Sequence, residues 1–139
     1  MNLRTSALIA ACGGALLATS SIAPAQYGER SPKDAQKLAR ALAGRTPGKP
    51  VSCISNTRGS DMQIIDDQTI LFREGGTVYV QSPRGGCHGL GNGSYTLVTQ
   101  LHGSNRLCSG QIGELVDRVS GFGYGSCIFG DFLPYRKTS

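Results

Sequence analysis

The stretch with the strongest structural signal is Thr69-Ile70-Leu71-Phe72-Arg73-Glu74-Gly75-Gly76-Thr77-Val78-Tyr79-Val80-Gln81. Side chains alternate in character through both halves, Ile70 and Phe72 with Thr69 and Arg73, then Val78 and Val80 with Thr77 and Gln81. A period of two residues is typical of a β-strand. The Glu74-Gly75-Gly76 segment between the halves has the composition of a turn. We therefore predict a β-hairpin that pairs 69–73 with 77–81 and directs one face toward the core.

Further short strands are predicted on both sides of this hairpin. They lie at 51–54 and 62–65 before it, and at 95–101, 106–109, 114–120 and 125–129 after it. Glycine or asparagine separates the later segments, and several short strands at this spacing are typical of all-β folds. The sequence thus predicts a mostly β fold, a small disulfide-linked barrel or sandwich.

One short amphipathic helix is predicted before the strands. Ser31 is a good N-cap, Pro32 suits the first helical position and Gly44 offers a C-cap. Between them, apolar residues recur at helical spacing at Ala35, Leu38, Ala39 and Leu42. Segment 45–50 contains two prolines and a glycine, which exclude a continued helix. We expect a turn-rich connector there and the β region from residue 51 onward.

The first 25 residues are typical of a cleavable secretion signal. A positive charge at Arg4 precedes an apolar run of small residues over 7–18, and Ala23-Pro24-Ala25 has the small-x-small pattern of a cleavage site. The run is shorter than the roughly 20 apolar residues of a membrane helix, so we predict no transmembrane span. The expected organisation is a signal peptide over 1–25, a helix and linker over 26–50, and a β domain over 51–139. The mature protein is expected to be periplasmic or secreted.

Cys12 permits a minor alternative. Ile9-Ala10-Ala11-Cys12 resembles a lipobox, in which the cysteine becomes the lipidated first residue of an envelope lipoprotein. Only eleven residues precede Cys12, and apolar sequence continues past it to Ile22. Since this leaves almost no hydrophobic region before such a cut, we expect Cys12 to be discarded with the signal.

The charge balance is mildly basic. The chain has 14 Lys and Arg against 9 Asp and Glu, and removal of Arg4 with the signal leaves 13 against 9, a net charge of +4. The charges are scattered without a run of five of one sign, so no nucleic-acid partner is predicted. Lys33, Lys37 and Arg40 share one face of the predicted helix, and a solvated face is favoured there over contact with anionic lipid.

Four cysteines remain after the expected cleavage: Cys53, Cys87, Cys108 and Cys127. An even number in a chain sent to an oxidising compartment favours two disulfides. Zinc is the alternative, but the gaps of 34, 21 and 19 residues lack the close pairs that metal sites of this size use. A redox-active pair also favours cysteines two residues apart. The residues by themselves leave all three connectivities open.

Residues 82–94 form what we call the glycine loop. It holds five glycines and too little apolar content for regular structure. Its Gly89-Leu90-Gly91-Asn92-Gly93 portion lacks the following helix that a phosphate-binding motif needs. Because a loop held on rigid strands commonly carries binding contacts, we predict a binding surface over 83–95, with Arg84, His88 and Tyr95 as contact groups. An inert connector is the alternative.

No catalytic signature is recognised. Cys87 and His88 are adjacent and would point to opposite sides of an extended chain, which does not suit a nucleophile and its base. His102 precedes a Gly-Ser-Asn turn. Three aspartates cluster between strands without calcium-loop spacing, and we expect them to cap turns: Asp61, Asp66 and Asp67. No cofactor or metal is predicted.

Five segments carry a resemblance to a known family. They read GRTPGKPVSCI at 44–54, IDDQTIL at 65–71, GC at 86–87, LCSG at 107–110 and CIFGDFLPY at 127–135. Together they resemble a family of small exported proteobacterial proteins classed only as a domain of unknown function. The resemblance covers nearly the whole mature domain and implies no substrate, cofactor or catalytic residue.

The resemblance also implies a cysteine pairing. More distant members of the family keep the cysteines that match Cys87 and Cys127 and lack those that match Cys53 and Cys108. This implies the pairs Cys53–Cys108 and Cys87–Cys127. Family members often carry an aspartate where this chain has Gln111, which argues against a metal or acid role at that position.

Three classes of function remain open from the sequence. The favoured class is a non-catalytic exported module of the cell envelope that binds a protein, glycan or lipid partner. The alternatives are a small, hydrolase-like periplasmic enzyme with an unrecognised site, and a metal-handling protein that uses the cysteines.

Overall fold

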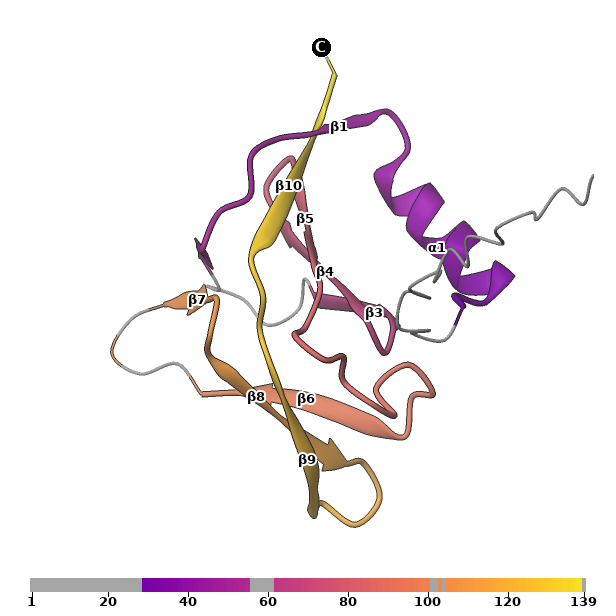
Figure 1. Cartoon of the computed structure of the whole chain (residues 1–139), viewed down its shortest axis with the longest axis vertical. Helices are drawn as coiled ribbons and strands as arrows, with labels where there is room; N and C mark the ends of the chain where they lie inside the picture. Colours follow the sequence, from indigo (N-terminus) through magenta and orange to yellow (C-terminus); the bar gives the residue numbers. More distant parts are fainter. Residues whose placement is uncertain (1–28, 56–61, 101–102, 104, 139) are drawn as a thin grey trace, which may run out of the picture.

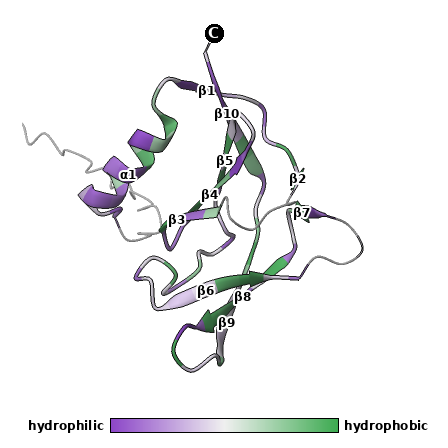
Figure 2. Cartoon of the chain, turned by 180° about the vertical axis from the view of Figure 1, so that it is seen from behind, coloured by the Kyte–Doolittle hydropathy of each residue, from purple (hydrophilic) through white to green (hydrophobic). Residues whose placement is uncertain are grey.

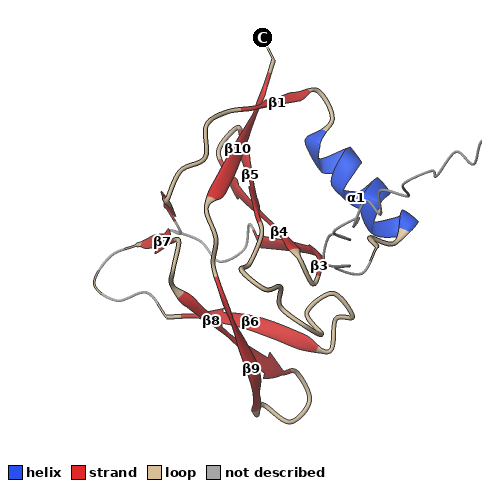
Figure 3. Cartoon of the chain, in the orientation of Figure 1, coloured by secondary structure: helices blue, strands red, loops and turns tan. Residues whose placement is uncertain are grey.

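The computed structural model describes residues 29–55, 62–100, 103 and 105–138 as one helix followed by ten strands (Figures 1 and 3). In chain order these are α1 (Pro32–Leu42), β1 (Arg45–Pro47), β2 (Cys53–Ser55), β3 (Met62–Asp66), β4 (Thr69–Glu74), β5 (Thr77–Gln81), β6 (Tyr95–Thr99), β7 (Arg106–Cys108), β8 (Ile112–Asp117), β9 (Gly123–Ile128) and β10 (Phe132–Lys137). The predicted mostly β fold with one N-terminal helix is confirmed.

In the described part of the chain, three antiparallel sheets make a small, sandwich-like fold that does not close into a barrel. The largest has the order β1-β10-β5-β4-β3, the second the order β6-β8-β9, and β2 pairs with β7 alone. Figure 1 shows the five-stranded sheet beside α1 and the three-stranded sheet at the opposite end of the molecule. Of the two predicted architectures, the sandwich is therefore the correct one.

The helix begins and ends where its capping residues predict. The Ser31 side chain accepts a hydrogen bond from the backbone nitrogen of Asp34 at 3.1 Å, which satisfies a donor at the first turn. Gly44, just beyond the helix, has a φ of 66°, in the left-handed region that glycine adopts without steric cost.

The predicted β4–β5 hairpin forms, but its register differs by one residue from the expected one, because Glu74 belongs to β4 and pairs with Thr77, with Ile70 opposite Gln81. The prediction that one face of it is directed to the core was wrong, because both faces are buried. Leu71 and Val78 belong to a small cluster that also contains Ile65 and is covered by α1 through Leu38, Ala41 and Leu42. Ile70 and Phe72 lie on the other face, in the main core. The sheet is thus a middle layer.

The main core lies between the five-stranded sheet and the other two sheets. Phe72 contacts the rings of Phe129 and Phe132 edge-on, with centroids 6.3 and 5.7 Å away. Leu97, Leu107 and Leu115 from the smaller sheets complete this cluster, together with Ile54, Cys87, Leu90 and Cys127. Burial of so many apolar groups is the main force that holds the layers together.

Two strands were missed by the sequence analysis. The expected connector over 45–50 contains β1, which pairs with β10 from Arg45 opposite Lys137 to Pro47 opposite Tyr135. The predicted start of the β region at residue 51 was therefore too late. β10 contains Pro134, which disfavours an inner strand because it lacks a donor. The Pro134 carbonyl accepts a hydrogen bond from the Gly48 nitrogen at 2.8 Å. Since the nitrogen and the carbonyl of one strand residue face the same side, the Pro134 nitrogen also faces this side, just past the end of β1.

No helix in the described part of the chain combines the length and apolar character needed to cross a bilayer. The four predicted disulfide cysteines form two bonds, Cys53–Cys108 and Cys87–Cys127, the pairing that the family resemblance implied. The first bond joins directly opposed residues of β2 and β7. The second joins the glycine loop to β9. Two such bonds fit an oxidising compartment.

Candidate functional site

An open groove of about 970 Å³ lies between the start of α1, the β3–β4 turn and the glycine loop. These three segments are far apart in the sequence. The lining residues are Glu29, Arg30, Ser31, Asp34, Asp66, Asp67, Gln68, Gly85, Gly86, His88, Gly89, Gly91 and Asn92.

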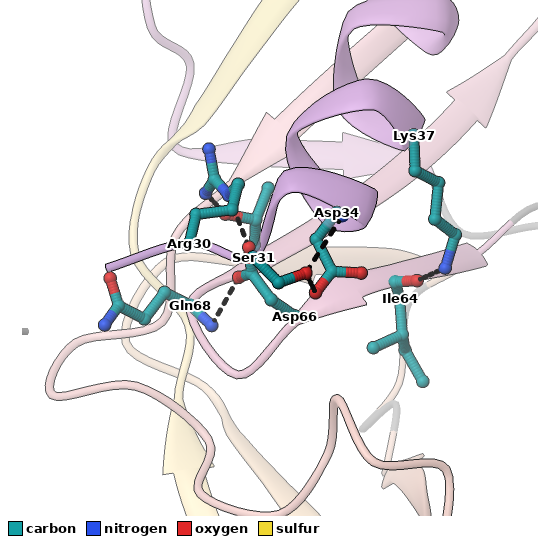
Figure 4. A network of polar contacts seen from close by, with 8 residues as sticks. Arg30, Ser31, Asp34, Lys37, Ile64, Asp66 and Gln68 are labelled. Carbon is teal, nitrogen blue, oxygen red and sulfur yellow. Dashed lines mark hydrogen bonds and ion pairs between the residues drawn. The ribbon is translucent and has the colours of Figure 1, made fainter. Parts of the chain in front are cut away.

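The floor of the groove is the β3–β4 turn. Asp66 accepts a hydrogen bond from the backbone nitrogen of Gln68 at 2.8 Å, the usual way in which an aspartate stabilises its own turn. Its other carboxylate oxygen is ion-paired with Arg30, whose guanidinium also donates to the hydroxyl of Thr69 (Figure 4). Arg30 thereby ties the segment before α1 to the five-stranded sheet.

Asp67 holds the glycine loop against this turn. Its carboxylate accepts from the backbone nitrogens of Gly89 at 3.0 Å and Gly91 at 2.7 Å, and its carbonyl accepts from Cys87. A Cβ on Gly91 would lie 3.0 Å from the Asp67 carboxylate and 3.1 Å from its backbone nitrogen. Glycine is therefore needed at position 91 so that the two backbones can approach closely.

The glycine loop is anchored at three more points. Cys87 is 1 % exposed and bonded to Cys127, and the Leu90 side chain is buried in the main core. At the start of the loop, the backbone nitrogen of Arg84 donates to the carbonyl of Ile128 at 2.8 Å. This wall of the groove is consequently held in one shape by covalent, apolar and polar contacts together.

The opposite wall is the first turn of α1. Ser31 donates from its hydroxyl to the Asp34 carboxylate at 2.6 Å, and Lys37 donates to the carbonyl of Ile64 (Figure 4). Lys37 was expected on a solvated face, and this contact shows that it also ties the helix to β3.

The groove is acidic although the whole chain is basic. Among the described residues, four carboxylates line it, those of Glu29, Asp34, Asp66 and Asp67, against the guanidinium of Arg30. The chain as a whole has a net charge of +5. A negatively charged hollow attracts ligands of positive charge.

The structure does not unite the three predicted contact groups. His88 is exposed and lines the groove. The guanidinium of Arg84 donates to the hydroxyl of Ser109 at 3.2 Å, and Arg84 does not line the groove. The Tyr95 ring stacks on Tyr124, with centroids 4.2 Å apart. Partial burial raises the pKa of Tyr95, and the neighbouring Tyr124 and Asp117 raise that pKa further.

The other sequence candidates have structural roles or lie outside the described residues. Asp66 and Asp67 act as turn and loop acceptors, as expected, whereas Asp61 and His102 lie outside the described residues. Cys87 has no free thiol, which ends its pairing with His88 as a nucleophile and base. The metal-handling alternative loses its ligands because all four cysteines are in disulfides. Among the described residues, no group of three or more metal-ligating side chains occurs.

Sequence reasoning missed the contribution of Glu29 to Asp34 to this site. These residues precede or begin the helix. Arg30 lies 36 positions before Asp66, and no local sequence pattern indicates that this segment contacts the β3–β4 turn. Comparison with protein-family models, with curated proteins and with solved structures found no match to this chain. The resemblance to the exported family therefore stays a prediction.

Proposed function

We propose that this protein is an exported, non-catalytic module of the cell envelope that binds a positively charged segment of a partner protein in the groove. The observation that carries the proposal is an acidic groove with a preformed wall. The glycine loop is fixed there by the Cys87–Cys127 bond, the Asp67 carboxylate and the buried Leu90.

A preformed wall favours binding because little conformational entropy is lost when a ligand arrives. The groove is open and lies between a helix and a loop, which suits an extended peptide segment better than an enclosed small molecule. Its exposed polar groups, His88 and Asn92, offer hydrogen bonds to a peptide backbone.

The charge of the groove defines the chemistry of the ligand. Asp66 is neutralised by Arg30, and Asp67 is held by backbone donors, so Glu29 and Asp34 are the carboxylates that remain for a ligand. Lysine or arginine side chains are the natural partners of such carboxylates. The periplasm or the exterior of the cell is the proposed location.

The proposal is tested with a lysine-rich peptide and a glutamate-rich peptide of the same length, added to ¹⁵N-labelled protein recovered from the periplasm. We expect the lysine peptide to move the amide signals of His88, Gly89 and Gly91. Glu29→Gln combined with Asp34→Asn should weaken this binding about threefold or more, because each exposed charge contributes up to about 1 kcal/mol at low salt.

The matched control is Glu114→Gln combined with Asp131→Asn, which removes two exposed carboxylates outside the groove. This control should bind the lysine peptide as the wild type does. Equal affinity for both peptides, or equal weakening by the two double variants, would remove the proposed role of the groove. Binding of envelope glycan without any dependence on Glu29 and Asp34 would show that the partner is a glycan and not a positively charged protein segment.

A further inference from the structure

The tip of the β8–β9 hairpin, residues 117–124, exposes large apolar side chains. Val119 is 97 % exposed, Phe122 77 % and Tyr124 62 %. Figure 1 shows this hairpin at the end of the molecule opposite to β1, and Figure 2 shows the sheet that carries it in mixed colours, with hydrophobic stretches on β6 and β8. Large exposed apolar groups that gather at one end of a protein indicate a contact surface.

The backbone nitrogens of residues 118–122 at the tip have acceptors inside the protein. Arg118 donates to the carbonyl of Ser94 at 3.1 Å, and Gly121 donates to the carbonyl of Asp117 at 2.9 Å. Val119 and Ser120 both donate to the Asp117 carboxylate, at 3.0 and 2.7 Å. Five consecutive N–H groups have partners once the bond from Phe122 to the Ser120 hydroxyl, at 3.4 Å, is included.

This pattern points to lipid as the occupant. A protein partner can supply acceptors of its own for such N–H groups. Lipid hydrocarbon supplies none, so a segment that enters it must satisfy its backbone internally.

The side chains fit the boundary of a bilayer. Tyr124 is held by its stack on Tyr95, and tyrosine is common at the level of lipid headgroups. The exposed Arg118 lies beside Val119, where its long side chain can reach lipid phosphate while its neighbour enters the acyl region.

We infer that the hairpin tip inserts into the interface of a lipid bilayer, with Val119, Phe122 and Tyr124 in the acyl boundary and Arg118 on a headgroup phosphate. The protein then lies on the membrane and does not cross it through this element. The inference rests on the tip alone, and it stands or falls separately from the groove.

The first test uses tryptophan fluorescence, since the chain contains no tryptophan. Phe122→Trp places a single reporter at the tip, and Thr46→Trp places one on exposed β1 at the other end. On addition of vesicles of mixed phosphatidylethanolamine and phosphatidylglycerol, the emission of Phe122→Trp should shift to shorter wavelength and that of Thr46→Trp should not.

The second test is co-sedimentation of the periplasmic protein with the same vesicles. Val119→Ser combined with Phe122→Ser should weaken partitioning about tenfold or more, because two apolar side chains no longer leave water. Val51→Ser combined with Ile112→Ser, which changes exposed apolar residues outside the tip, should partition as the wild type does. Arg118→Ala should weaken binding to these vesicles more than binding to phosphatidylcholine, because only the former carry a net negative surface charge.

All variants keep the same N-terminus, so any contribution of that segment cancels in the comparison, and amide spectra establish that each variant is folded. Equal emission shifts of the two tryptophan variants, or equal partitioning of the tip variant and the control variant, would overturn the inference. So would binding of the tip to a protein partner without any binding to vesicles.

Discussion

Gln81 is a polar side chain buried in the middle of the protein. It is 0 % exposed, and neither its amide nitrogen nor its amide oxygen has a hydrogen-bond partner among the described residues. It lies opposite Ile70 on one side and Phe132 on the other, within the middle layer. An amide removed from water without a partner lowers the free energy of unfolding.

We expect Gln81→Met to raise the free energy of unfolding by about 1–3 kcal/mol, because methionine has a similar volume and no donor or acceptor to desolvate. Chemical denaturation of both proteins measures the change. Gln100→Met, at an exposed position, is the control and should change the free energy little. A loss of stability in Gln81→Met would show that the amide is hydrogen-bonded in solution, as by an ordered water.

A β-bulge in the β8–β9 hairpin changes the direction of one side chain. The register shifts between Leu115 and Val116, so that Gly125 and Gly123 pair with them and Tyr124 is the extra residue. Such a bulge bends its strand and redirects a side chain. Here it accompanies the stack of Tyr124 on Tyr95, which joins the hairpin to the start of β6.

The turn of the same hairpin depends on the charge of Asp117. Hydrogen bonds from the Ser120 backbone and hydroxyl, and from the Val119 backbone, hold the pKa of this carboxyl below its ordinary value of 3.8. Because the folded-state pKa is depressed, the contribution of the Asp117 carboxylate to stability is complete above its unfolded-state pKa. It is lost as the pH falls through the folded-state pKa.

We therefore expect the wild type to lose stability as the pH falls below 3.8 more steeply than Asp117→Asn does, since the variant keeps an acceptor oxygen and no longer titrates. Thermal unfolding at a series of acid pH values measures the two slopes. Ser120→Ala removes one donor to the carboxylate, and NMR titration should place the pKa of Asp117 closer to its ordinary value in that variant. An unchanged pKa there would contradict the assigned cause.

At the scale of the whole molecule, the two disulfides join segments that lie far apart in the sequence. Cys53–Cys108 closes a separation of 55 residues and Cys87–Cys127 one of 40. Cross-links of this span stabilise mainly by restricting the unfolded chain.

Replacement of either cysteine pair by alanine should lower the free energy of unfolding by about 4 kcal/mol on the chain-entropy account. Loss of Cys87–Cys127 should cost more, because both cysteines are buried in the main core and their removal leaves a cavity. Only this second variant should also lose the peptide binding proposed for the groove. Chemical denaturation and peptide titration of the two double variants test these expectations. A separate experiment, peptide mapping without reductant, would refute the pairing itself if it found Cys53 joined to Cys87.

Sequence alone determined what depends on neighbouring residues. The β4–β5 hairpin, the cap of α1 at Ser31 and the turn at Asp66 each arise from spacing and side-chain chemistry within a few positions, so each was predictable. The disulfide pairing was not predictable in this way, because spacing permits every connectivity, and it followed only from the family resemblance.

Tertiary structure decided where separate segments meet. β1 and β10 form because residues 45–47 pair with the strand at 132–137, which lets Pro134 lie in an inner strand although its own sequence argues against one. The hairpin is buried on both faces because α1 folds back over it. The groove requires Arg30, Asp67 and His88 to come together from three segments, and contacts over such separations leave no periodic signal in the sequence because they are selected only by the packing of the finished fold.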